Sequence, residues 1–390
     1  MHAKLIVARV LNPCLNKLHA KRCAALQRAV TAVLLGGALN LSSIALAMAG
    51  AVGLRHRLKS VDRLLGNSGL QDARASIYGG LAHLWLCGLP QVLLVVDWSD
   101  LTPDQRWHWL RASVAVNGRS LTLYEEVHPQ RLYANRDVHR RFLSRVAQIL
   151  PAGCVPIVMT DAGFHSTWFN LVAERGWSYV GRIRGRDMVR QVDGQWIGCK
   201  ALYTRASQNA LDLGRYDYVR SNCTECRLVL IKDNPKGRYR FGRSRPKCVT
   251  AAREPWLLAA STSLDHLSAQ SIVNLYAQRM TIEESFRDTK NLRWGQGLNT
   301  TRSRSRARLQ ILLLLAHLAS FVQRLIGEDA KARQLELQFS PTNRTSRAQI
   351  SVLSLGRRIL DAPSQWLDSL TPWSAIPPLT QQARAACVSA

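Results

Sequence analysis

The sequence predicts an α/β fold with additional helices at both ends of the chain. Apolar runs typical of buried strands cover 91–98 and 155–160, and amphipathic helical stretches separate the strand patterns. The length of 390 residues allows roughly two to four domains. The apolar fraction of 47% is enough for hydrophobic cores, so a disordered basic tail protein is excluded.

The charge of the chain predicts a polyanionic partner. Lys and Arg number 53 against 26 Asp and Glu, which gives a formal net charge of +27. The positive charge is spread along the chain and Arg outnumbers Lys, which suits phosphate because a guanidinium can donate to two oxygens at once. This balance argues against an ordinary metabolic enzyme, and it predicts binding to nucleic acid or to an anionic membrane face.

The N-terminal part allows two interpretations. No charged residue occurs over 29–54, a length that can cross a bilayer. Many of these residues are Ala or Gly, however, and polar residues interrupt the run. We therefore favour a helix that ends near 36–37, a turn at 40–43 and a second helix over 43–48, which is the pattern of a helix-turn-helix. Basic residues that suit phosphate contacts follow, namely Arg55, Arg57, Lys59 and Arg63.

The stretch from 91 to 183 alternates between strand and helix patterns. The predicted strands cover 91–98, 111–116, 120–127, 155–160 and 177–183. Asn117-Gly118 is a strong signal for a tight hairpin between the second and third strands. The predicted helices cover 136–150, which stops before Pro151, and 166–175.

Two of these strands end in an acidic residue. Asp97 lies at the end of the first strand, and Asp161 follows the strand at 155–160. Open α/β sheets place their functional sites at the carboxyl ends of such strands. Each Asp taken alone is more simply explained as a turn or cap residue, so the pair becomes persuasive only if a third carboxylate joins it.

Residues 185–255 interrupt the alternation. They are rich in Arg, Lys and Tyr and contain short alternating segments, which predicts a small β-rich insertion with a basic loop over 233–247. Basic residues interleaved with aromatic ones suit binding along a nucleic acid, although a solvated loop explains them almost as well. The core pattern returns at 255–261.

A helix predicted over 268–291 has the most informative spacing in the chain. At about 100° per residue, one narrow stripe contains Tyr276, Arg279, Glu283 and Lys290. Apolar residues lie beside that stripe, namely Leu275, Ile282 and Phe286. The helix can therefore pack on the sheet and present the polar row at its edge. A surface helix with chance salt bridges does not explain an acid among three groups that suit phosphate.

Asp97, Asp161 and Glu283 together predict a site for two divalent metal ions. Carboxylate oxygens are the ligands that Mg²⁺ and Mn²⁺ prefer. Two ions about 3.5–4 Å apart can activate the attacking oxygen and stabilise the leaving oxygen in phosphodiester chemistry. The sequence has no GxxxxGK[ST] phosphate loop, so we do not expect ATP to drive the reaction.

Nine cysteines are scattered along the chain, which predicts a reducing cytoplasm as its compartment. Cys223 and Cys226 form the one close pair. Cys199 or Cys248 would be needed to complete a zinc site, and a single CxxC is a weak signal for one.

Alternate arginines follow the polar helix, and we expect them to bind DNA backbone. They are Arg302, Arg304, Arg306 and Arg308. An apolar helix predicted over 309–322 is too short for a comfortable membrane span and is expected in the core. A further helix is predicted near 350–360, and the residues after about 378 are expected to be disordered.

Three segments of the sequence resemble a known family. They are VVDWSD at 95–100, TDAGF at 160–164 and YAQRMTIEESFRDTK at 276–290. Together they resemble the DDE transposases of bacterial insertion sequences, in the branch with a Tyr-Arg-Glu-Lys signature and the group of the composite tetracycline-resistance transposon. The similarity covers most of the chain but fades through 187–250 and after about 325.

The resemblance implies a domain organisation. A helical DNA-binding domain would occupy 1–85, and a ribonuclease-H-like catalytic core with a β-strand insertion would occupy 86–325. A helical C-terminal region at 326–390 would be available for dimerisation.

The resemblance also implies roles for particular residues. The catalytic, metal-binding triad maps to Asp97, Asp161 and Glu283. The residues that hold the DNA strand near the scissile phosphate map to Tyr276, Arg279 and Lys290. Trp256 would stack on a flipped base, unless it is a core tryptophan.

The implied function is cut-and-paste transposition by a homodimer that acts on the nucleoid in the cytoplasm. Each end would be nicked, closed as a hairpin, reopened and joined to target DNA through its 3′-OH. Two other functions stay open. One is a repressor or inhibitor that binds transposon ends without cutting them, and the other is a two-metal nuclease of the same fold.

Overall fold

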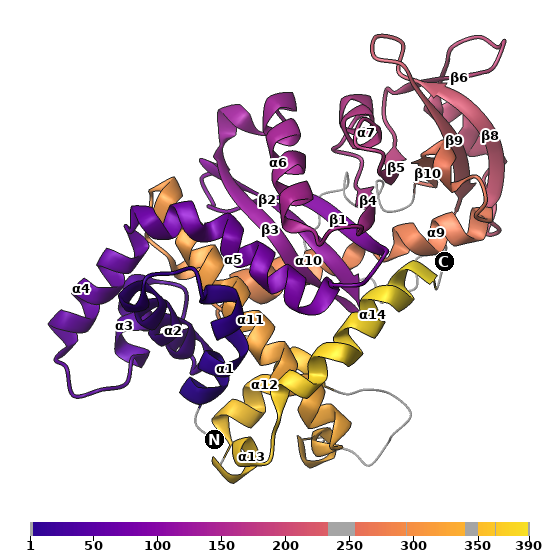
Figure 1. The fold of residues 1–390 in the computed structure, drawn as a ribbon. Helices are drawn as coiled ribbons and strands as arrows, with labels where there is room; N and C mark the ends of the chain where they lie inside the picture. The colour runs from indigo at the N-terminus through magenta and orange to yellow at the C-terminus, as the bar shows by residue number, and fades with distance from the viewer. Residues whose placement is uncertain (1–2, 233–253, 294, 340–349, 363, 389–390) are drawn as a thin grey trace.

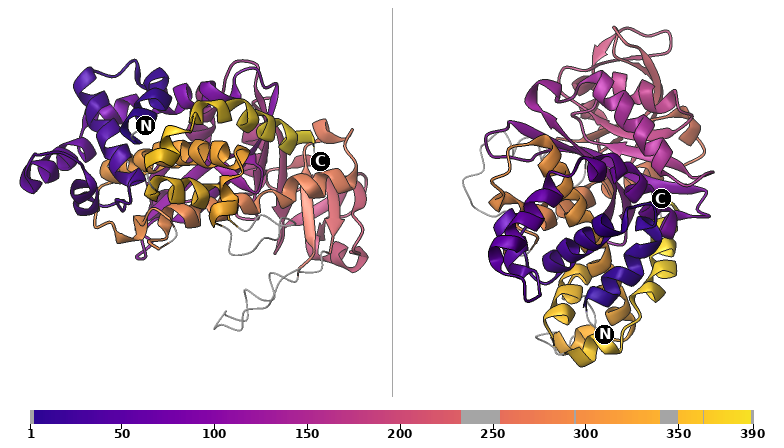
Figure 2. Two further views of the ribbon diagram at one scale, coloured as in Figure 1. Left: turned by 90° about the horizontal axis from the view of Figure 1, so that it is seen from below. Right: turned by 60° about the vertical axis from the view of Figure 1, so that its left-hand side comes forward.

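The structure is a computed structural model, and it describes residues 3–232, 254–293, 295–339, 350–362 and 364–388. A large mixed sheet runs through it, and the helices of the two chain ends pack together beside this sheet (Figure 1). The left view of Figure 2 shows the N-terminal helices at one end of the molecule and the strands that follow residue 185 at the other. The predicted α/β class is confirmed.

The sheet contains ten described strands in the order β3-β2-β1-β4-β5-β10-β9-β8-β6-β7. The first five are β1 Gln91–Asp100, β2 Trp107–Val116, β3 Arg119–Pro129, β4 Val155–Thr160 and β5 Ser178–Ile183. β4 pairs in parallel with β1 and with β5, whereas the other neighbours are antiparallel. All five strands predicted before 184 are therefore present. The predicted helices between them are α6 Arg136–Ile149 and α7 Ser166–Ala173.

The predicted hairpin joins β2 to β3 through Asn117 and Gly118. Gly118 has φ +67°, a backbone conformation that glycine adopts without steric cost. The hairpin strands extend further than expected at the end away from the turn, because β2 begins at Trp107 instead of Arg111. The sequence at 107–110 is apolar enough to be buried there, with Trp109 fully inaccessible to solvent.

The segment after residue 185 is β-rich, as predicted, and its strands widen the same sheet. They are β6 Met188–Gln191, β7 Ile197–Gly198, β8 Leu211–Tyr218 and β9 Thr224–Ile231. β9 pairs with β10, Trp256–Ala260, which in turn pairs with β5. The basic loop expected over 233–247 lies outside the described residues.

The N-terminal part is a bundle of helices. They are α1 Ala3–Leu15, α2 Ala20–Leu34, α3 Leu41–Ala47, α4 Leu54–Leu65 and α5 Ser68–Leu86. Asn40 caps α3, because its Oδ1 accepts the N–H of Ser43 at 2.8 Å. The expected order of helix, turn and second helix is confirmed, and the uncharged stretch 29–54 is divided among short elements.

The prediction of one continuous helix over 268–291 is wrong. The structure divides it into α9, Ala269–Ala277, and α10, Met280–Lys290. At the junction, the amides of Gln278 and Arg279 bond to carbonyls three residues earlier, as in a 3₁₀ turn. The rotation of about 100° per residue does not continue regularly through this junction. Tyr276 on α9 and the residues on α10 therefore do not form the single stripe that the spacing predicted. The prediction that the apolar side of this segment packs against the sheet is confirmed, because Leu275, Ile282 and Phe286 are buried.

The predicted helix at 309–322 is part of a longer one, α11, Arg306–Ala332. The charged residues in the second half of α11 do not end the helix. Arg324, for example, is buried and is paired with Glu328 at 2.7 Å. α11 is continuous across 325, where the expected core and C-terminal region meet. Among the described helices, α11 alone is long and apolar enough to cross a membrane, and 89% of its most apolar window is buried inside the protein.

The expected disorder after residue 378 is wrong. The C-terminal part contains α12 Val352–Asp361, α13 Ser364–Asp368 and α14 Ile376–Val388. α14 packs against β1, β2 and α5, and it buries Leu379, Ala383 and Ala386. Thr380 also donates to the carbonyl of Trp85 at 2.7 Å. These small apolar residues gave little signal on their own, but they fit a surface that the sheet provides.

A buried carboxylate joins the sheet to the helices around it. Glu125 on β3 is fully buried and accepts hydrogen bonds from Tyr78 at 2.9 Å, Trp109 at 2.8 Å and Arg111 at 2.9 Å. Arg111 on β2 also donates to the hydroxyl of Ser285 on α10 at 3.0 Å. The network therefore links β2, β3, α5 and α10 in the interior, where unpaired charges are costly.

We expect Glu125→Ala to lower the free energy of unfolding by about 3–5 kcal/mol, because it leaves the buried Arg111 without its counter-ion. Chemical denaturation measures this change. The control is Glu174→Ala at the exposed end of α7, which should change stability by no more than about 0.5 kcal/mol. Equal stability of the two variants would contradict the role of the network.

Candidate active site

Asp97 and Asp161 lie next to each other at one edge of the sheet. The last paired residues of the parallel strands β1 and β4 are Val96 and Thr160. The residue that follows each of these in the chain is an aspartate, Asp97 on β1 and Asp161 just after β4, so the two carboxylates are neighbours, as the sequence predicted. Asp97 is buried, with 9% of its surface exposed, and Asp161 is partly exposed.

The electrostatic environment disfavours a negative charge on Asp97. Burial is the largest cause and the charge of Asp161 the second, and together they raise the pKa of Asp97 to about 8. Arg279 and the N–H of Trp98, which donates to Oδ1 at 2.8 Å, act in the opposite direction. Two carboxylates in such a position favour a bound cation, since it offsets both the burial and the repulsion.

Arg279 lies between two of the predicted carboxylates. Its guanidinium is 3.6 Å from Asp97 Oδ2 and 2.8 Å from Glu283 Oε1. Burial opposes its charge, but Tyr276, Asp97 and Glu283 raise the pKa of Arg279 above its ordinary value, so it remains a cation. In this structure Arg279 therefore acts as the counter-ion that brings Glu283 towards the strand ends.

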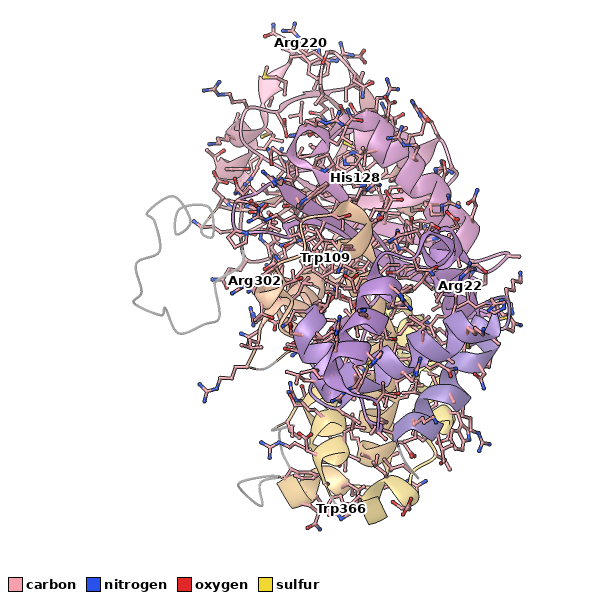
Figure 3. The ribbon with its side chains drawn as sticks, turned by 90° about the vertical axis from the view of Figure 1, so that its left-hand side faces the viewer. Arg22, Trp109, His128, Arg220, Arg302 and Trp366 are labelled. Atoms are coloured by element: carbon pink, nitrogen blue, oxygen red, sulfur yellow. The ribbon has the colours of Figure 1, made fainter. Side chains whose placement is uncertain are left out.

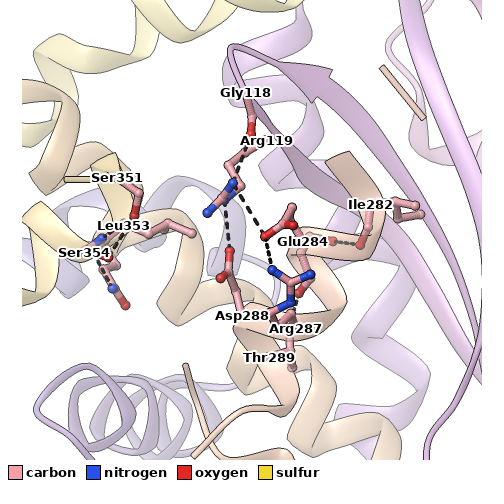
Figure 4. A network of polar contacts seen from close by, with 12 residues as sticks. Gly118, Arg119, Ile282, Glu284, Arg287, Asp288, Thr289, Ser351, Leu353 and Ser354 are labelled. Atoms are coloured by element: carbon pink, nitrogen blue, oxygen red, sulfur yellow. Dashed lines mark hydrogen bonds and ion pairs between the residues drawn. The ribbon is translucent and has the colours of Figure 1, made fainter. Parts of the chain in front are cut away.

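Contacts along α10 fix the position of Glu283 relative to the sheet. Arg119 at the start of β3 is 3.3 Å from Asp288 and 3.9 Å from Glu284 (Figure 4). On the buried side of α10, the ring of Phe286 packs edge-on against Trp109 with centroids 4.8 Å apart. With the bond from Arg111 to Ser285, these contacts hold α10 against β2 and β3.

Lys290 lies at the end of α10 and reaches the end of β1. Its ammonium donates to the hydroxyl of Ser99 at 2.7 Å. Burial lowers the pKa of Lys290, and the charges of Asp100 and Asp97 raise it. Ser99 was missed in the sequence, although it is two residues after Asp97 and side chains two apart share one face of a strand.

Tyr276 and Trp256 lie together between α9 and β10. Tyr276 is buried, with 3% of its surface exposed, and its ring meets that of Trp256 edge-on with centroids 5.1 Å apart. Burial raises the pKa of Tyr276, while the charges of Arg279 and Arg182 lower it. The guanidinium of Arg279 lies 5.9 Å from the centre of the Tyr276 ring. Trp256 is partly exposed at the start of β10. Arg182 on β5 is a further cation beside this site that the sequence did not single out.

Arg302 and Arg304 lie in a different place from the carboxylates. They line a hollow of about 620 Å³ beside α3 that also includes Asn40 and several Ser and Thr residues. Arg302 is labelled in Figure 3. Within the described residues, no hydrogen bond or ion pair joins either arginine to Asp97, Asp161 or Glu283.

The donor types at the sheet edge fit a hard divalent cation, but their present arrangement does not surround one. In the described ranges, no three or more His, Cys, Asp or Glu side chains are grouped so that they could hold a metal ion. Arg279 occupies oxygens of both Asp97 and Glu283, so all three carboxylates can face one cation only after Arg279 moves. Of the two cysteines considered for a zinc site, Cys226 is buried and Cys223 is exposed.

A comparison with models of protein families gives a match. A family model described as a transposase DDE domain matches residues 88–321, which is more than half of the chain. This range contains the strand ends and α10. No curated protein matches the chain.

The raised pKa of Asp97 makes a prediction about stability without metal. Between its ordinary value of 3.8 and about 8, the folded protein holds a proton that the unfolded chain has lost. The stability of the metal-free protein should therefore fall as the pH rises through this window. Asp97→Asn removes the ionisation, so at pH 8 its melting temperature should exceed that of the wild type, by about 1 °C for each kcal/mol gained in a chain of 390 residues.

Differential scanning calorimetry at pH 5 and pH 8, with chelator present, tests this prediction. The control Asp72→Asn changes an exposed carboxyl on α5 and should follow the wild type at both pH values. A melting temperature of Asp97→Asn below that of the wild type at pH 8 would show that Asp97 is charged and stabilising in the fold.

Proposed function

Because this chain belongs to the family of transposases with a DDE domain, we propose that it excises a DNA segment and joins it to target DNA by cut-and-paste transposition. The observation that carries the proposal is the acidic edge of the sheet, where Asp97 and Asp161 are neighbours and Arg279 holds Glu283 near them. The family is one of metal-dependent enzymes that act on DNA. The order β3-β2-β1-β4-β5, with β1 to β3 antiparallel, supports a ribonuclease-H-like core.

The proposed catalytic and metal-binding residues are Asp97, Asp161 and Glu283. Mg²⁺ or Mn²⁺, two per site, would activate the attacking oxygen and stabilise the leaving oxygen. The strand ends supply Asp97 and Asp161 from a rigid sheet, and α10 supplies Glu283. Arg279 is released from the carboxylates when they bind cations, and its guanidinium is then available to a phosphate.

Four further residues would hold the DNA strand, namely Tyr276, Arg279, Lys290 and Trp256. Lys290 supports this proposal because it places an ammonium beside the end of β1. Trp256 supports it because its ring is partly exposed and packs edge-on against Tyr276, and we propose that a flipped base stacks on the exposed part. The buried Tyr276 acts here mainly by positioning Trp256 and Arg279.

The proposed reaction consists of in-line phosphoryl transfers at one site. One strand is nicked at each end, the freed 3′-OH attacks the opposite strand to close a hairpin, and water reopens it. The 3′-OH then attacks the target. No covalent enzyme intermediate and no ATP are required, since water or a 3′-OH attacks in each transfer and the carboxylates would hold the metal ions that assist it.

A basic groove on the N-terminal helices supports binding of terminal inverted repeats by residues 1–85. The groove of about 530 Å³ is lined by Lys21, Arg22, His56, Lys59 and Arg63 and by no acidic residue. Arg22 lies at the surface of these helices (Figure 3). Arg57, which the sequence suggested as a phosphate contact, instead donates to the carbonyl of Met48 at 2.6 Å and so caps α3.

Arg302 and Arg304 extend this proposed DNA path towards the catalytic core. The hollow that they line also contains Asn40 and Ser42 at the start of α3, so one DNA backbone can contact both regions. We further propose that two protomers synapse two ends in the bacterial cytoplasm, on the nucleoid, with the helices of 326–390 at the dimer contact. No membrane is part of this proposal.

Two alternatives remain distinguishable. A repressor or inhibitor of transposition would bind the ends without cutting them. A two-metal nuclease would cut DNA that lacks terminal inverted repeats. Short inverted repeats on both sides of the gene would favour transposition over the nuclease.

We expect Asp97→Ala to abolish Mg²⁺-dependent cleavage of the flanking end sequence and to leave binding to that sequence unchanged. The reason is that the groove lined by Lys59 and Arg63 does not include the carboxylate edge. Cleavage gels and mobility-shift assays measure the two properties. Asp72→Ala serves as the control and should cleave as the wild type does. Persistent cleavage by Asp97→Ala would make the triad assignment wrong.

We expect Lys290→Ala to slow strand processing about tenfold or more, because a charge-assisted contact to phosphate is lost. Folding should change little, since the ammonium makes one hydrogen bond to Ser99. Single-turnover cleavage and thermal unfolding provide the readouts. Arg287→Ala, on the exposed side of the same helix, should retain normal rates. A lower melting temperature with normal activity would contradict the prediction for Lys290.

A further inference from the structure

An exposed tyrosine lies beside the carboxylate edge and has no role in the function proposed so far. Tyr133 follows the short 3₁₀ helix η1, Gln130–Leu132, in the connection from β3 to α6. Its side chain is 45% exposed, although it is large and mostly apolar. Within the part of the chain that the structure describes, its hydroxyl has no hydrogen-bond partner.

The ring of Tyr133 is held in place by two neighbours from the end of the sheet. Its centroid is 5.1 Å from that of Trp98, which follows Asp97 on β1. It is 4.8 Å from the ring of His108 on β2, and His108 is paired with Asp100 at 3.1 Å. The ring is therefore held by two aromatic neighbours and still remains partly exposed.

The backbone around Tyr133 is also fixed. Ala134 has φ +52°, a left-handed conformation that is unfavourable for alanine. Asn135 then caps α6, since its Oδ1 accepts the N–H of Asp137 at 2.9 Å and of Val138 at 3.2 Å. Strain of this kind persists where the surrounding structure demands it, and it is common at functional sites.

The charges around Tyr133 favour an uncharged planar group over a phosphate. Partial burial raises the pKa of Tyr133, and Asp161, Asp97 and Asp100 raise it further, so the ring lies within electrostatic reach of the carboxylate edge. These acids repel a phosphate. Arg131 and Arg136 flank the ring in sequence and are exposed, and neither pairs with a carboxylate among the described residues.

A partly exposed aromatic ring, with one exposed arginine two residues before it and another three residues after it, is a combination that suits single-stranded nucleic acid, with bases on the ring and backbone on the cations. We propose that Tyr133 stacks on an unpaired nucleobase of the DNA strand next to the scissile phosphate, with Arg131 and Arg136 on its backbone. This inference rests on the proposed function, because it places the strand at the carboxylate edge. Tyr133 is separate from Trp256, which lies on β10.

The test uses a duplex from the DNA flanking the gene, with 2-aminopurine beside the cleavage position and Ca²⁺ in place of Mg²⁺. Stacking on an aromatic ring quenches the fluorescence of this base. Binding of the wild type or of Tyr133→Phe should quench the fluorescence of 2-aminopurine, whereas binding of Tyr133→Ala should not. Loss of one stacked base should weaken binding of the nicked duplex about 5- to 150-fold, which corresponds to 1–3 kcal/mol.

The control variant is Val155→Ala, which removes an exposed apolar side chain at the opposite end of β4. It should quench and bind as the wild type does, and all variants should have similar melting temperatures. Quenching by Tyr133→Ala equal to that of the wild type, or no quenching by the wild type, would overturn the inference. A wild type that quenches the base but does not cleave with Mg²⁺ would support stacking and contradict the proposed function.

Discussion

The arrangement of the candidate site depends on the hydrogen bonds that the buried side chain of Arg111 makes. Arg111 lies on β2 opposite Asp97 in the strand register, and it joins the buried Glu125 of β3 to Ser285 of α10. A buried guanidinium that bonds in both directions leaves little freedom for α10 to slide along the sheet. Glu283, two residues before Ser285 on the same helix, thereby takes its position from the same contact that stabilises the interior. Stability and the geometry of the acidic edge thus have a common origin.

The charge distribution explains how an acidic site can exist in a strongly basic protein. The net charge of +27 attracts a polyanion, whereas the carboxylate edge repels further negative charge, as the effect of Asp161 on the pKa of Asp97 indicates. In this structure Arg279 offsets part of that repulsion by lying between Asp97 and Glu283. Under the proposed function, the same arginine would neutralise the site before metal and DNA arrive and would bind phosphate afterwards. This dual use would account for a cation on the helix that also bears the third carboxylate.

Much of the fold was predictable because local pattern and tertiary burial agree. The apolar runs that end at Asp97 and Asp161 are buried strands, and Asn40 caps a helix as its neighbours suggested. The break at Gln278 was not predictable, since the helical pattern continues through it and only packing against the sheet imposes the tight turn. The helix at 376–388 was missed because its small residues have meaning only against β1 and β2. Tyr133 reaches the site through a connection between β3 and α6, and no sequence spacing encodes that proximity.

The most direct test of the account is to locate Mn²⁺ by anomalous scattering in crystals of the protein bound to its end DNA. The account predicts Mn²⁺ between Asp97 and Asp161, Glu283 among its ligands, and Arg279 moved from the carboxylates to a phosphate. Mn²⁺ bound elsewhere, with Arg279 still paired to Asp97 and Glu283, would contradict it.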